Sequence, residues 1–161
     1  MKGTSRQPSN LSESLHQRLN SYALAASAAG VSIVSLDLYD SGKDRLSSLS
    51  DGFLRLSVAW RAEPGLAPCS VTIRVRREDG VCCARCESPV PQGEGEGCAE
   101  AAIGGLNLTT GRYFAEVVIE DAASLKPLAS RVSGMFWVPG EFDLRRGHDG
   151  VIAVRPRWSF H

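Results

Sequence analysis

The sequence predicts an all-β protein, an antiparallel β-sandwich preceded by a linker helix. Seven or eight short segments alternate apolar and polar residues with the period of two that is typical of strands. Glycine- and proline-bearing turns such as Asp79-Gly80 and Pro139-Gly140 separate these segments. From Gly30 onward no helical periodicity lies between them, and strands in direct succession favour two packed antiparallel sheets.

The clearest strand covers residues 111–121. Its alternation assigns one set to a core: Tyr113, Ala115, Val117 and Ile119. The opposite face holds Arg112, Phe114, Glu116, Val118 and Glu120. Because Phe114 and Val118 are apolar where solvent favours charge, this outer face is a candidate functional surface.

Other strands are expected at residues 31–39, 53–60, 69–77, 81–87, 98–103, 129–138 and 151–158. Residues assigned to the core by their phase are Leu54, Leu56, Val58, Trp60, Val71, Ile73, Val75, Val132, Phe136 and Val138. Residues 88–97, with the Gly-Glu-Gly-Glu-Gly run, are expected to form a mobile loop. Pro156 indicates an edge strand or a bulge at the end of the chain.

The N-terminal region does not show the strand pattern of the rest of the chain. Residues 1 to about 10 are a polar lead-in, and residues 10–29 predict a helix that ends at Gly30. One apolar stripe runs along this helix, at Leu11, Leu15, Leu19 and Tyr22. The 161 residues therefore divide into a tail and linker helix, 1–29, and one sandwich domain, 30–161.

Composition excludes several classes of protein. The formal net charge is zero, which gives no reason to expect nucleic acid as a partner. The N-terminus lacks the apolar core of a signal peptide, and no apolar run is long enough to span a membrane. Five cysteines, an odd number, fit a reducing compartment. A cytoplasmic location without membrane insertion is expected.

No metal, cofactor or catalytic motif emerges. Cys83 and Cys86 have CxxC spacing, but the four ligands of a structural zinc site are not at hand, and small buried thiols explain them equally well. No nucleophile elbow or phosphate-binding loop is present, and the pair Glu116 and Glu120 suits any solvated strand. We therefore expect no enzyme, no catalytic residue, no bound metal and no cofactor.

The aromatic residues favour binding. Phe114, Trp137 and Trp158 fall on outward phases of their strands. An exposed ring beside polar side chains suits a sugar, whose C–H face stacks on the ring while its hydroxyls form hydrogen bonds. The alternative is that these rings cover an edge, a dimer interface or the N-terminal helix. Phase alone leaves both interpretations open.

The order of these segments resembles a known family. The segments are the 31–39 strand, Gly52-Phe-Leu-Arg-Leu, the 71–77 strand with Glu-Asp-Gly, Leu108-Thr-Thr-Gly-Arg-Tyr, Val117-Val-Ile-Glu-Asp, Phe136-Trp-Val and the terminal Trp158. From about Gly30 to the C-terminus they are similar to the C-terminal carbohydrate-binding domain of Wzt, the nucleotide-binding subunit of O-antigen polysaccharide ABC exporters. The chain departs from that family in lacking a Gly-x-x-x-x-Gly-Lys-Ser/Thr ATPase motif and in its cysteine-rich strand.

The resemblance implies an Ig-like sandwich that recognises the non-reducing end of lipid-linked O-polysaccharide and couples finished glycan to export. It also implies a homodimer with a swapped last strand, and work beside the nucleotide-binding and transmembrane subunits of the exporter at the cytoplasmic face of the inner membrane. The alternative is a dimerisation or docking module that binds protein.

Physical reasoning, rather than the resemblance, selects the candidate carbohydrate-binding residues. They lie on outward phases of four strands: Arg55, Ser57, Arg74, Arg76, Phe114, Glu116 and Trp137. Arg74 and Arg76 would also suit an anionic sugar cap. These residues converge only if their strands share one sheet.

Overall fold

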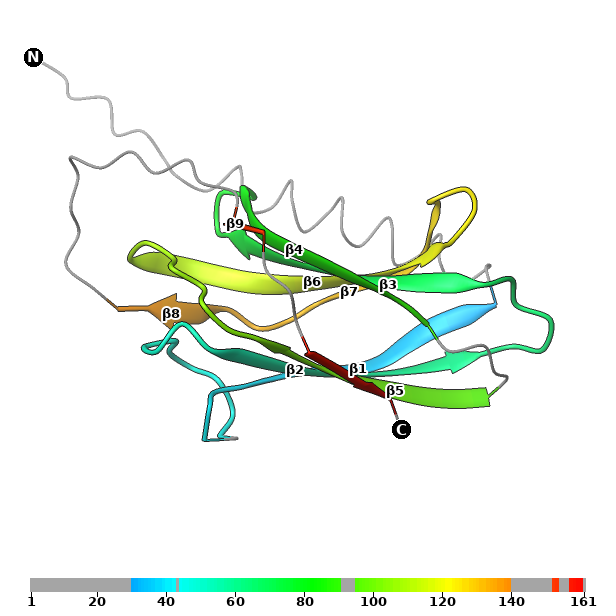
Figure 1. The fold of residues 1–161 in the computed structure, drawn as a ribbon, viewed down its shortest axis with the longest axis horizontal. Helices are drawn as coiled ribbons and strands as arrows, with labels where there is room; N and C mark the ends of the chain where they lie inside the picture. Colours follow the sequence, from blue (N-terminus) through cyan, green and yellow to red (C-terminus); the bar gives the residue numbers. More distant parts are fainter. Residues whose placement is uncertain (1–29, 43, 91–94, 140–151, 154–156, 161) are drawn as a thin grey trace, which may run out of the picture.

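A computed structural model describes residues 30–42, 44–90, 95–139, 152–153 and 157–160 (Figure 1). These residues form two β-sheets packed face to face, which confirms the predicted β-sandwich. The helix predicted at residues 10–29 lies outside the described residues. Within the described part of the chain, no helix is long and apolar enough to cross a membrane.

The four-stranded sheet has the order β1-β2-β5-β10. Its strands, all paired antiparallel, are β1 (Val31–Tyr39), β2 (Leu54–Ala62), β5 (Gly95–Ile103) and β10 (Arg157–Phe160). The six-stranded sheet has the order β7-β6-β3-β4-β9, with β8 also paired to β6. Its strands are β3 (Cys69–Arg77), β4 (Cys82–Pro89), β6 (Gly111–Asp121), β7 (Pro127–Val132), β8 (Phe136–Val138) and β9 (Ile152–Ala153). Only β4 and β9 pair in parallel among the described strands.

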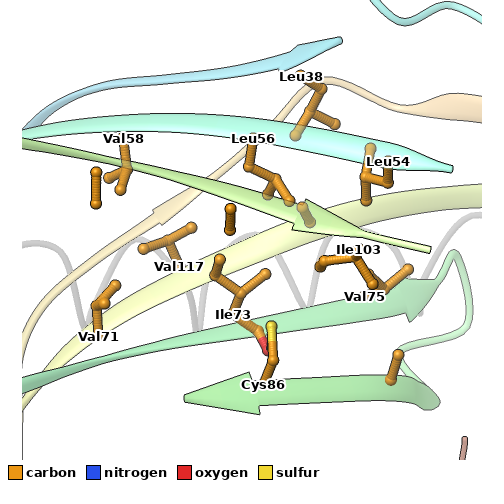
Figure 2. Packing of buried hydrophobic residues seen from close by; sticks show 14 of the residues in the cluster. Leu38, Leu54, Leu56, Val58, Val71, Ile73, Val75, Cys86, Ile103 and Val117 are labelled. Carbon is orange, nitrogen blue, oxygen red and sulfur yellow. The ribbon is translucent and has the colours of Figure 1, made fainter. Parts of the chain in front are cut away.

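The core lies between the inner faces of the two sheets (Figure 2). Leu54, Leu56 and Val58 of β2 meet Val71, Ile73 and Val75 of β3 across it, as their phases predicted. Tyr113, Val117 and the other inward residues of β6 are also buried there. The period of two in the sequence thus identified the inner faces of β2, β3 and β6 correctly.

Tyr113 fixes the entry into β6. Its hydroxyl donates a hydrogen bond to the carbonyl oxygen of Thr109 at 2.8 Å, and its ring stacks on Phe136 with centroids 6.1 Å apart. A tyrosine near the start of a strand that bonds back to the backbone upstream is the tyrosine corner of Greek-key sandwiches. The Gly-Arg-Tyr sequence therefore anchors the loop before β6 to the core.

The glycine-rich run corrects one expectation. Residues 95–97 were expected in a mobile loop, but they are the first residues of β5. The reason lies across the sheet, where Gly97 pairs with Trp60. A Cβ atom on Gly97 would come within 2.6 Å of Cζ2 of the indole, so the ring occupies the space of the missing side chain.

In place of the one strand expected at residues 129–138, the structure has two, β7 and β8. As a result, one residue that was assigned to the core, Val132, lies elsewhere. Val132 pairs with Glu116 and therefore lies on the outer face of the six-stranded sheet, because directly paired residues share a face. Phe136 and Val138 are buried as predicted. The break at residues 133–135 shifts the phase between the two strands.

The C-terminal segment also divides, into β9 on the six-stranded sheet and β10 on the four-stranded sheet. Trp158 pairs with Ala101 and packs against the core, so its predicted outward position is wrong. Its ring stacks on that of Phe160, with centroids 6.0 Å apart. Within this single chain β10 pairs with its own β5, and exchange of this strand between two copies stays a prediction.

Candidate functional site

The two sheets divide the predicted site residues. Arg74, Arg76, Phe114, Glu116 and Trp137 belong to the six-stranded sheet, on strands β3, β6 and β8. Arg55 and Ser57 belong to β2 of the four-stranded sheet. The outer faces of a sandwich point in opposite directions, so these two groups cannot contact one ligand together. The two outer faces are therefore separate candidate sites.

The outer face of the six-stranded sheet contains a charge network. Arg74 donates to Glu120 at 2.8 Å and to Glu116 at 3.5 Å. Arg76 donates to Glu116 at 2.8 Å and to the carbonyl oxygen of Gly80 at 2.9 Å. The hydroxyl of Thr72 donates to Glu120 at 3.0 Å. Pairing of β3 with β6 creates this network, because Arg74 stands opposite Glu116 in the register.

This face is closed, contrary to expectation. Phe114 is 4% exposed and Glu116 is 6% exposed, so the idea of an aromatic and a carboxylate facing solvent is wrong. The two arginines already bond two carboxylates of the protein, which leaves little positive charge for an anionic sugar cap. The sequence could not show this, because the partners are 40 or more residues apart.

Trp137 lies at the end of the same outer face, opposite Arg112. It is 46% exposed. Its backbone is held on the other side by residues 47–49, since its N–H donates to Ser47 and its carbonyl accepts from Leu49. Trp137 is thus exposed as predicted, but it stands at one edge of the buried network.

The outer face of the four-stranded sheet is open and polar. Across β1, β2 and β5, Tyr39, Arg55 and Ala102 form one row. Asp37, Ser57 and Glu100 form the next row. β10 extends these rows with Arg157 and Ser159, both exposed. The small side chains in the middle leave room above the sheet between the longer ones.

Four polar side chains on this face are available to a ligand. Tyr39, Arg55, Ser57 and Glu100 form no side-chain hydrogen bond within the described residues. Asp37 accepts a hydrogen bond from Arg45 at 2.8 Å. Guanidinium, hydroxyl and carboxylate groups side by side can donate to and accept from the hydroxyls of a sugar, and Tyr39 adds a ring for stacking. We define Tyr39, Asp37, Arg55, Ser57 and Glu100 as the polar face.

Sequence reasoning found Arg55 and Ser57 on this face but missed Tyr39, Asp37 and Glu100. The alternation in residues 31–39 sets Asp37 and Tyr39 on one phase, and this signal could have identified them. Their alignment with β2 depends on a bulge between Ile33 and Ser35, which no local pattern predicts.

The cysteines do not gather into a cluster of metal ligands within the described residues. None of the five forms a disulfide, and no group of three or more metal-ligating side chains occurs among the described residues. Burial raises the pKa of the Cys86 thiol to about 12. At neutral pH this thiol is protonated, and it packs in the core as a small apolar side chain.

The fold and the polar face together define a β-sandwich with a candidate ligand-binding surface on one sheet. The structure is similar to the crystal structure of the C-terminal domain of Wzt, with a TM-score of 0.59 and 17% sequence identity. The similarity covers 76% of this chain and 84% of that chain, and it establishes a shared fold. No family model matches the chain, and no curated protein matches it.

Proposed function

We propose that this protein is a non-catalytic carbohydrate-recognition domain of a polysaccharide ABC exporter, and that it binds glycan on the polar face. The observation that carries the proposal is that Tyr39, Arg55, Ser57 and Glu100 form no side-chain hydrogen bond among the described residues. They lie on a sandwich that shares its fold with the C-terminal domain of Wzt. A hydroxyl-rich ligand would satisfy these groups, whereas the charge network on the opposite face is satisfied already.

The specific ligand proposed is the non-reducing end of a lipid-linked O-antigen polysaccharide. Recognition of a finished end would couple completed glycan to export by the nucleotide-binding and transmembrane subunits, at the cytoplasmic face of the inner membrane. A homodimer would present two polar faces, and bivalency would offset the weak affinity for each sugar. The resemblance in segment order to the Wzt domain supports these details.

Calorimetric titration with the O-polysaccharide of the strain of origin tests the proposal. Arg55→Ala should weaken binding at least about tenfold, since it removes charge-assisted donors to the glycan. Arg61→Ala is the matched control, because Arg61 lies on the same strand but pairs with Glu96. Equal affinity of the Arg55→Ala variant and the wild type would refute this location.

Removal of the terminal sugar tests end recognition separately. Polysaccharide trimmed by one residue at its non-reducing end should lose affinity while its internal repeats stay unchanged. If trimmed and intact chains bind equally, the domain recognises internal repeats and the end-specific proposal fails.

A docking module is the second candidate, and the exposure of Trp137 beside the exposed Met135 favours it. Trp137→Ala separates the two functions, because the polar face lies on the other sheet. Loss of self-association with intact glycan binding would assign Trp137 to docking. Loss of glycan binding in this variant would contradict the proposed location on the polar face.

A further inference from the structure

We propose that residues 10–29 of this chain pack on the outer face of the six-stranded sheet and form a third layer there. The centre of that face is buried although it lies outside the core. Phe114 and Val118, which is 3% exposed, do not belong to the cluster between the sheets. Thr72, which pairs with Val118, is fully buried as well. Something therefore covers this face.

The described strands do not supply that cover. The partners of β6 are β3, β7 and β8, and each pairs with it edge to edge within the sheet. On the flanking strand β4, the side chain of Arg85 is 51% exposed. The cover is therefore narrow and follows β3 and β6. Two strands are about 10 Å wide, which is the diameter of one helix with its side chains.

The start of β1 lies near the edge of this face. Arg131, on the edge strand β7, donates hydrogen bonds to the carbonyl oxygens of Ile33 at 3.1 Å and Val34 at 2.8 Å. β1 thus begins beside the edge of the six-stranded sheet, although it pairs in the other sheet. From the start of β1, only β7 separates the chain from the outer face of the six-stranded sheet.

The chemistry and length of the segment fit the face. Its apolar stripe, Leu11, Leu15, Leu19 and Tyr22, would pack on Phe114 and Val118. A helix of this length extends about 30 Å, comparable with the roughly 37 Å of β6. Ser70 Oγ, buried on the same face without a hydrogen-bond partner among the described residues, marks a place where a polar group of the segment could bond. The Arg–Glu network would then lie beneath a helix.

Packing of residues 10–29 on this face would be independent of glycan binding. It assigns the outer face of the six-stranded sheet to a segment of the chain itself. The polar face on the other sheet then remains the free outer surface of the sandwich.

Thermal unfolding of the full-length chain tests the contact. We expect the triple variant Leu11→Ala, Leu15→Ala, Leu19→Ala and the single variant Val118→Ala each to lower Tm. Their combination should lower Tm by less than the sum, because both remove the same contacts. Val117→Ala is the control, since Val117 is the next residue of β6 but faces the core, and its effect should add to that of the triple variant. If the Tm changes of the triple variant and of Val118→Ala simply add in the combined variant, the proposal is overturned.

Limited trypsin digestion gives a second measurement. Packing should protect the bond after Arg18, and Phe114→Asp should speed its cleavage about tenfold through local opening. Arg85→Asp, on the exposed flank of the same face, should not. Native cleavage as fast as in an unstructured peptide would overturn the proposal. So would dissociation of a dimer by Phe114→Asp with unchanged cleavage, because a second copy would then occupy the face.

Discussion

Arg74 and Glu120 bond at 2.8 Å on the outer face of the six-stranded sheet, with Glu120 almost fully buried. Thr72 donates a further hydrogen bond to the same carboxylate. This arrangement makes the network a structural element of the sandwich. Its charges are used by the protein and are not left for a ligand.

Glu120→Ala should therefore destabilise the fold by about 2 kcal/mol, because Arg74 keeps only its longer bond to Glu116 and Thr72 loses its acceptor. Glu87→Ala is the control, since Glu87 pairs with Arg85 in solvent and should change stability by less than about 0.5 kcal/mol. Urea unfolding measures both values. Equal changes in the free energy of unfolding for the two variants would show that burial does not strengthen this network.

Gly97→Ala should destabilise the protein by about 1–3 kcal/mol, because the added methyl would overlap the buried indole of Trp60. Gly134→Ala serves as the comparison, since nothing lies within 4 Å of the place that its methyl group would take and its backbone is not left-handed. That change should be neutral or stabilise slightly. Denaturant midpoints of the two variants should move by clearly different amounts, and equal midpoints would contradict the close approach of Trp60.

Tyr113→Phe should cost about 1 kcal/mol, because the carbonyl oxygen of Thr109 loses its donor while the ring stays stacked on Phe136. Tyr39→Phe removes a hydroxyl from the surface instead and should leave the free energy of unfolding unchanged. An unchanged unfolding midpoint for Tyr113→Phe would show that the corner bond contributes nothing.

The Cys86 thiol should resist modification at pH 8, since burial raises its pKa to about 12 and leaves almost no thiolate. Native wild-type protein and native Cys86→Ser should then release equal amounts of thionitrobenzoate from Ellman's reagent. In urea the variant should release one equivalent less. A deficit in the native variant would contradict the buried position of this thiol.

Local sequence pattern predicted the strands and their inner faces, since alternation such as Leu54, Leu56 and Val58 reports burial directly. Pattern could not assign Arg55 and Arg74 to different sheets, because strand pairing is decided by contacts far apart in the chain. The same limit explains Gly97, whose place in a strand depends on Trp60 of another strand.

The outer faces show the limit most clearly. Phe114 alternates correctly with Tyr113, yet its face is buried as well. The apolar Phe114 and Val118 mark this outer face as unusual, but they do not distinguish a covered face from a ligand-binding one. For the same reason, alternation alone assigned Arg55, Ser57, Arg74 and Glu116 equally to outer faces. In the structure Arg74 bonds Glu116, whereas Arg55 and Ser57 form no side-chain hydrogen bond within the described residues.

We propose that glycan binds on the four-stranded sheet. Titration of the isotope-labelled full-length protein with its O-polysaccharide, followed by amide chemical shifts, tests it most directly. We predict shifts centred on Ser57 and Glu100, which face each other across β2 and β5, with little change at Arg74 and Glu116. Shifts centred on Arg74 and Glu116, with Ser57 and Glu100 unmoved, would contradict it.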